Sequence, residues 1–278
     1  MEMFKYEFIR NAMLAGFIIG VLCSVLSVFV VLKKMAFIGQ GIAHAAFGGI
    51  AFAILLNLDT FYTAIVFCIL VAIGIGMVSR KGKVSEDSSI GIFLTTSMAL
   101  GVIFLNMKKE YSQDVFSYLF GNILSVTHED VIRITVLGAV VLALIIIYYR
   151  KLQYFTFDEE TARVANVPVD FLYYMLLISL SVVIVMTVQV VGVILVSAFL
   201  IIPATVALLI GRRFVQVMII SVIIGITANF TGLVSSYHLR ISSGASIVIT
   251  LFLIFIITFA IKKIKEKIQS KNMKNRVE

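Results

Sequence analysis

The chain has 278 residues, of which 61% are hydrophobic and only 14% are charged, and its formal net charge is +8. Soluble domains carry roughly 25% charged residues, so a soluble fold of this composition would leave large apolar patches exposed, whereas a bilayer would cover them. The basic residues fall in short clusters between apolar runs, which argues against nucleic acid as the partner and indicates a membrane protein.

The apolar segments predict helices that cross a membrane, which need about 20 residues each. They are too long, and alternate too little, for the strands of a membrane barrel. In chain order they are roughly 8–32, 41–57, 60–79, 89–107, 131–149, 171–189, 191–210, 215–235 and 244–261. Eight crossings are the alternative if 41–57, which is short and glycine-rich, or 191–210 does not span fully. The predicted fold is all-α: a polytopic membrane helix bundle of eight to nine transmembrane helices, forming a single domain over 1–278.

Lysine and arginine indicate which connections face the cytoplasm. They gather in every second connection, for example at Lys33 and in the cluster 80–83, and again in the basic tail 262–278. We therefore predict a cytoplasmic C-terminus and an N-terminus outside. Lys108 and Arg133, on the predicted outer side, are exceptions to the pattern.

The cytoplasmic loop 156–168 is long enough to hold a short helix. Asp158 is suited to cap its N-terminus, and acidic residues follow in the first turn. Asn166 tolerates the left-handed conformation at a helix end, and Pro168 prevents continuation. We predict a helix over 159–165 lying on the cytoplasmic face.

The outer connection 108–130 has a moderately apolar middle, which we interpret as a short re-entrant helix rather than another span. Acids and histidines at an outer mouth would raise the local concentration of cations. The candidates are Asp114, His128 and Asp130 in this connection, with His238 at another outer end. Ordinary solvated loop residues are the simpler alternative.

The segment 39–53, GQGIAHAAFGGIAFA, contains the strongest candidate site. Gln40 and His44 are four residues apart and share one helical face. Small residues allow close approach, and an imidazole inside a span is costly enough to indicate function. Neutral histidine is a common ligand of first-row metals. We interpret both residues as part of an ion path; the alternative is a packing histidine bonded to a neighbouring carbonyl.

Two other segments carry polar or helix-breaking residues inside apolar runs. Ser97, with Thr95 and Thr96, would face a polar path, unless these hydroxyls bond back to their own helix. Pro203 frees a backbone carbonyl within a span, and broken helices often line transport paths; a mere kink is the alternative. The chain has no Walker loop and no nucleophile elbow, so it is not expected to be an enzyme, and any ATP would be hydrolysed by another subunit.

Five motifs, spread in order over nearly the whole chain, resemble the zinc/manganese/iron permease family of ABC transporters. They are GQGIAHAAFGGIA, EDSSIGIFLTTSMALGVI, LFGNILSV, VGVILVSAFLIIPATVA and SSGASIV. The resemblance implies a fold like that of type II ABC importers and a homodimer in a prokaryotic cell membrane. It also implies a cytoplasmic pair of ABC ATPase subunits and an extracellular or periplasmic metal-binding protein. The divalent zinc, manganese or iron would be transported cargo, with no permanently bound cofactor.

The same resemblance assigns roles to individual residues. Glu159, Ala162, Arg163 and Asn166 match the ATPase-coupling pattern E-x-x-A-x-x-x-G, with Asn in place of Gly. Many family members have Asp four residues before the histidine, where this chain has Gln40. Because an amide is a weaker ligand than a carboxylate for a divalent cation, the choice of metal stays open.

Three other functions are alternatives. The permease of a siderophore or vitamin importer would share the coupling loop but not the GxxxAHA segment. A stand-alone secondary cation transporter would need acidic residues deep in its spans, and no apolar segment contains one. A membrane enzyme would need a nucleophile and a base in mutual reach, which three scattered histidines do not supply.

Overall fold

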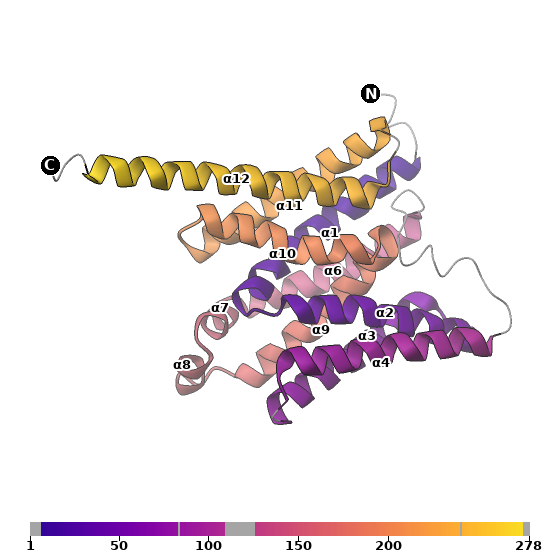
Figure 1. Cartoon of the computed structure of the whole chain (residues 1–278). Coiled ribbons are helices and arrows are strands. Elements are labelled where there is room, and N and C mark those ends of the chain that lie inside the picture. The colour runs from indigo at the N-terminus through magenta and orange to yellow at the C-terminus, as the bar shows by residue number, and fades with distance from the viewer. Residues whose placement is uncertain (1–6, 83, 109–125, 240, 275–278) are drawn as a thin grey trace.

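The computed structural model describes residues 7–82, 84–108, 126–239 and 241–274 (Figure 1). Within these ranges every regular element is an α-helix. The helices are α1 (Glu7–Leu32), α2 (Ala36–Leu56), α3 (Thr60–Lys81), α4 (Glu86–Met107), α6 (His128–Ile147), α7 (Tyr149–Phe157), α8 (Glu159–Val164), α9 (Val169–Val191), α10 (Val193–Ile210), α11 (Phe214–Leu239) and α12 (Ser243–Lys274). The predicted all-α membrane bundle is confirmed.

Among the described residues, eight helices are long and apolar enough to cross a bilayer, and the apolar part of α10, Leu195–Ile210, is shorter. The 18 residues of α10 extend about 27 Å, close to the roughly 30 Å of a bilayer's hydrocarbon core. Of the two segments that were uncertain from the sequence, α2 begins earlier than predicted, at Ala36, and has 21 residues. The short helix is therefore α10, and the total stays within the predicted eight to nine.

The helices lie roughly side by side, with α7, α8 and the end of α12 at one end of the bundle and the start of α1 towards the other (Figure 1). The spans α1 and α9 are the most buried, and α4 and α12 are the most exposed. We call the end that carries α7 and α8 the coupling end and the opposite one the distal end. Apolar surface on α4 and α12 suits contact with lipid chains or with another membrane helix.

Helix α1 approaches α11 closely through small and polar residues. The Asn229 side-chain amide donates a hydrogen bond to the carbonyl of Gly16. A Cβ added to Gly225 would overlap Ser24 Oγ and lie 2.9 Å from the carbonyl oxygen of Gly20. Inside a bilayer no hydrophobic effect drives helices together, so close packing and hydrogen bonds between helices must do so. Small residues such as these allow that close packing.

The distal end is fixed by caps that explain the two basic exceptions to the charge pattern. Lys108 Nζ donates to the carbonyl of Ile54 and to Asn57 Oδ1, both at 2.7 Å, at the end of α2. Arg133 pairs with Asp59, the residue that caps α3, at 3.7 Å. Both cations therefore have local partners at this end.

The region between α6 and α9 corrects the sequence prediction. One short helix was expected there, but the chain forms two, α7 and α8. Helix α7 buries Leu152 and Phe155 completely against the bundle, and this burial holds the helix in place. The segment is too short to be recognised as a span from the sequence. The preceding span, predicted at 131–149, is shifted towards the N-terminus and ends at Ile147.

Two predicted regions are only partly covered by the structure. In the connection 108–130, residues 109–125, which include Asp114 and the expected re-entrant helix, lie outside the described residues. The last residues of that connection, from His128, already belong to α6. The basic tail 262–278 continues α12 as a helix up to Lys274.

Candidate ion path and coupling region

Glycines bring α2 into direct contact with the backbones of its neighbours. A Cβ added to Gly48 would lie 2.5 Å from the carbonyl oxygen of Ser97 in α4. One added to Gly49 would lie 3.0 Å from the Cα of Ala64 in α3. Larger residues at these positions would push the helices apart, so the glycines determine where the polar side chains of α2 lie.

The polar side chains of α2 lie on a face that the rest of this copy leaves partly uncovered. Gln40 is exposed and His44 is half-buried, while Phe37, one turn before Gln40, is 61% exposed. All three share one side of the helix because they are separated by three or four residues. An amide and an imidazole facing lipid inside a span are costly, so this face needs a polar neighbour or a water-filled path.

Two hydroxyl residues of α4 have different surroundings: Ser97 is packed against α2, and Thr95 bonds to carbonyls of its own helix. Ser97 is 3% exposed, and its carbonyl oxygen faces Gly48 of α2. Thr95 Oγ1 donates to the carbonyls of Gly91 at 2.8 Å and Ile92 at 3.2 Å, as the alternative drawn from the sequence anticipated. The role of Ser97 on an ion path stays a prediction.

Pro203 is buried within α10, and two other helices brace the backbone around it. Because proline has no N–H, the carbonyl of Phe199 lacks its usual partner. The next amide, of Ala204, donates to Ser27 Oγ of α1 at 3.1 Å. Ser27 Oγ in turn lies 3.4 Å from Ser221 Oγ of α11. These contacts therefore join α1, α10 and α11 around Pro203, and a place for Pro203 on the ion path stays a prediction.

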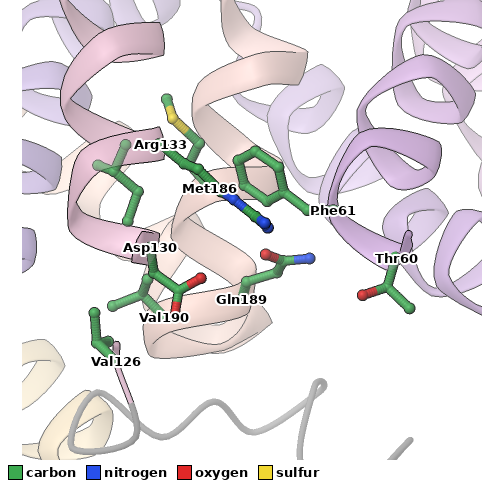
Figure 2. A pocket seen from close by; sticks show the side chains of 9 residues that line it. Thr60, Phe61, Val126, Asp130, Arg133, Met186, Gln189 and Val190 are labelled. Atoms are coloured by element: carbon green, nitrogen blue, oxygen red, sulfur yellow. The ribbon is translucent and has the colours of Figure 1, made fainter. Parts of the chain in front are cut away.

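A polar pocket of about 250 Å³ opens at the distal end between α3, α6 and α9 (Figure 2). Its lining includes Thr60, Phe61, Asp130, Arg133, Met186 and Gln189. Figure 2 shows the Arg133 guanidinium and the Gln189 amide extending towards each other across the pocket. Arg133 is also an ion-pair partner of Asp59 at 3.7 Å and of Glu129 at 3.9 Å.

Of the residues predicted at the outer mouth, three are described by the structure, and only Asp130 lines this pocket. Asp130 lines the pocket, but its carboxylate also accepts hydrogen bonds from the backbone and hydroxyl of Thr127, forming a capping box. His128 and His238 are exposed and do not line it, and Asp114 lies outside the described residues. Over the described ranges, no three His, Cys, Asp or Glu side chains gather as a metal site would require.

At the coupling end, Glu159 joins the short helix α8 to two membrane helices. Its carboxylate accepts a hydrogen bond from Lys33 at 3.0 Å, just after α1, and another from Arg80 near the end of α3. Arg80 also pairs with Asp170 in the first turn of α9. Burial opposes ionisation of Glu159, but the hydrogen bond and charge of Lys33, with the charge of Arg80, outweigh it and lower the pKa of the carboxyl.

The rest of the predicted coupling region forms a compact turn around α8. Asp158 caps the helix by accepting from the amides of the next turn, and the Thr161 hydroxyl and these amides lower the pKa of its carboxyl. Ala162 is 1% exposed, and Asn166 has the expected left-handed backbone, with φ of 56°. Arg163 pairs with Asp170 at 3.0 Å.

Three partners of this turn were not predicted from the sequence. Lys33, Arg80 and Asp170 complete the ion-pair cluster around Glu159 and Arg163. Two of them were counted only as markers of the cytoplasmic side. The acidic residues of this loop and the basic residues at the neighbouring helix ends do indicate that ion pairs form here. The sequence alone does not show which basic residue pairs with which acid.

The fold and these two regions define a multi-span membrane transport subunit, with a polar face in the bilayer and a charged turn at one end. Comparison with known proteins agrees. The model of the ABC 3 transport family matches residues 5–262, and the chain belongs to this family. As the family consists of membrane permease subunits of ABC transporters, the chain is a transport subunit rather than an enzyme.

Relatives and solved structures are similar over nearly the full length. The chain is 33% identical over 258 residues to the manganese transport system membrane protein MntC of Halalkalibacterium halodurans, covering 93% of this chain and 88% of that protein. It is 34% identical to the manganese import system permease protein ScaB of Streptococcus gordonii, covering 92% of each. The structure of PsaBC from Streptococcus pneumoniae in complex with Fab matches with a TM-score of 0.83 and 36% identity, over 92% of each chain.

Proposed function

We propose that this chain is the membrane-spanning permease of an ATP-driven importer of divalent transition-metal ions. Manganese is the first candidate, ahead of zinc and iron, because similar proteins carry manganese in their names. The observation that carries the proposal is the polar face of α2, a helix long and apolar enough to cross the bilayer, where Gln40 and His44 are incompletely covered by their own chain.

Two copies of the chain explain this face better than one. Facing lipid, an amide and an imidazole would lose hydrogen bonds that bilayer chains cannot replace. If a second copy lies against α2, both chains contribute Gln40 and His44 to a shared path, and the ion meets nitrogen and oxygen ligands from each. Transient coordination suits transport, because an ion that is held tightly is not released. The metal is cargo, and no permanently bound cofactor is required.

The coupling end is proposed to face the cytoplasm of a prokaryotic cell. Lys33 and Arg80 bind Glu159 of α8 at this end. The end of α12 also lies there (Figure 1), in agreement with the tendency of basic residues to stay on the cytoplasmic side. A pair of ABC ATPase subunits would dock on α8 there. The distal end would face outwards, where an extracellular or periplasmic metal-binding protein delivers the ion.

Motion of the ATPase subunits would reach α2 through Glu159. Lys33, which Glu159 binds, lies three residues before α2 begins at Ala36. A displacement of α8 therefore acts on the turn that leads directly into the helix of Gln40 and His44. The position and orientation of α8 would depend on four residues: Glu159, Ala162, Arg163 and Asn166.

Transport by the reconstituted system tests the proposal. The permease is placed in liposomes with its ATPase subunits inside and the metal-binding protein outside, and uptake of manganese, zinc and iron is measured separately. Uptake that requires ATP and the binding protein, with manganese preferred, is expected. Uptake that continues without ATP, or ATP hydrolysis that the binding protein stimulates without any metal entering, would contradict the proposal.

A further inference from the structure

Beyond metal transport, the α10–α12 groove at the coupling end has the features of a separate binding site. This open groove has a volume of about 580 Å³, within the range of roughly 300–1,000 Å³ that is usual for small-molecule pockets. Its walls come from the end of α10, the turn after it, and the part of α12 that extends past that turn (Figure 1).

The lining of the groove changes from apolar to basic residues along its two helices. Along α10, the apolar residues Leu208 and Leu209 precede Arg212, and along α12, Ile261 precedes Lys262 and Lys265. Both helices run towards the coupling end (Figure 1), so the cations lie nearer that end than the apolar residues do. Apolar walls followed by cations match a molecule that has hydrocarbon chains and an anionic head.

The cations of the groove differ from the three that surround α8. Lys33, Arg80 and Arg163 are each paired with an acid. Within the described part of the chain, no ion pair or side-chain hydrogen bond involves the charged groups of Arg212, Lys262 or Lys265, although Glu266 also lines the groove. Three cations against one acid leave a positive surplus that only an anion from outside the chain would neutralise.

We infer that the α10–α12 groove binds the phosphate head of an anionic phospholipid from the adjoining leaflet, with its acyl chains along Leu208 and Ile261. A basic pocket between membrane helices is a usual site for such heads. A zwitterionic lipid is disfavoured, because its own amine would meet the surplus of positive charge. The inference relies on the proposed orientation only for naming the leaflet as cytoplasmic, and it does not depend on which ion is transported.

Native mass spectrometry of the purified permease–ATPase complex, titrated with phosphatidylglycerol or phosphatidylcholine of identical chains, tests this inference. Wild type should retain phosphatidylglycerol preferentially, one molecule per permease copy. Replacing Arg212, Lys262 and Lys265 with Gln should weaken that retention about 100-fold, because each basic residue near an anionic lipid contributes roughly a fivefold factor. The matched control replaces Arg150, Arg213 and Lys263 with Gln, which removes equal charge from exposed positions outside the groove and should leave retention unchanged.

A single charge reversal, Lys265→Glu, covers the case in which the triple variant does not fold, and it should lower retention at least as much as one neutralisation does. Millimolar inorganic phosphate should not displace the lipid, because the apolar walls contribute to binding. Equal retention of both lipids, equal loss in the triple variant and its control, or displacement by phosphate alone would overturn the inference. So would lipid that binds the isolated permease but is expelled when the ATPase subunits bind, since the groove would then belong to the subunit interface.

Discussion

The carboxylate of Glu159 and the ammonium of Lys33 lie 3.0 Å apart and connect α8 to the turn between α1 and α2. The Glu159 side chain is 31% exposed and that of Lys33 only 15%, so the pair is sheltered, though not dry. Arg80 shares the same carboxylate. A small movement of α8 therefore acts at once on the ends of three membrane segments.

Replacing Glu159 with Gln should separate ATP hydrolysis from transport. The amide keeps the size of the side chain but leaves Lys33 and Arg80 without their shared counter-charge. We expect metal uptake to fall about tenfold, or roughly 1.4 kcal/mol of lost coupling, while ATP hydrolysis continues. Uptake and phosphate release are measured in the same proteoliposomes. Glu160→Gln, at the exposed neighbouring position, is the matched control and should behave like wild type; equal effects of the two variants would remove Glu159 from the coupling path.

The lowered pKa of Glu159 predicts how its contribution to stability depends on pH. A carboxyl whose pKa is lower in the folded state stabilises the fold above its unfolded pKa of about 4.3 and loses that contribution as pH falls through the folded value. The difference in melting temperature between wild type and Glu159→Gln should stay constant from about pH 8 to pH 5.5, shrink as the pH falls below the unfolded pKa of about 4.3, and vanish only below the folded pKa. A difference that instead disappears between pH 8 and pH 6 would mean that another group titrates.

The close contact of α1 and α11 predicts a large effect of one methyl group. Gly225→Ala would force Ser24 and the Gly20 carbonyl away, and we expect a loss of about 1–3 kcal/mol in the free energy of unfolding. Thermal unfolding of the purified full chain measures it. In the control variant Gly91→Ala, the added Cβ meets no atom within 4 Å, so stability should be unchanged or rise slightly. Equal destabilisation in both would contradict the close contact of Gly225 with α1 as the cause.

Replacing Gln40 with Asp should raise the affinity of the permease for the metal ion. Gln40→Asp places a carboxylate four residues from His44, and carboxylates bind divalent cations more strongly than amides do. The apparent KM for manganese uptake should fall several-fold, with a lower maximal rate because release becomes slower. The control Phe37→Asp adds the same charge one turn away on the same face. A KM that falls equally in both variants would indicate general attraction of cations rather than a ligand at position 40.

Features determined locally were predictable from the sequence, and contacts between distant segments were not. Apolar length sets the spans, and the Asp158 cap and left-handed Asn166 bound α8, because each depends on neighbours in the chain. The pair Lys33–Glu159 joins residues 126 positions apart, which no periodicity reports.

The same limit applies to α7 and to the candidate site. Helix α7 is too short to register as a span and forms because Phe155 is buried by helices elsewhere in the chain. For Pro203, the sequence predicted a freed carbonyl but not that Ser27 of another helix binds the next amide. Gln40 and His44 were expected on one helical face, but how little of that face the rest of the chain covers depends on the packing of α3, α4 and α10 around α2.

The measurement that tests the central claim most directly is ATP-dependent uptake of radiolabelled manganese by proteoliposomes containing His44→Ala permease, compared with wild type at equal incorporation. His238→Ala, which removes an exposed histidine at the distal end, is the control. If His44 lies on the ion path, its substitution should reduce uptake about tenfold or more, the loss expected for one metal ligand of roughly 1.4 kcal/mol, and the control should retain most of it. Wild-type uptake by His44→Ala would contradict an ion path along α2.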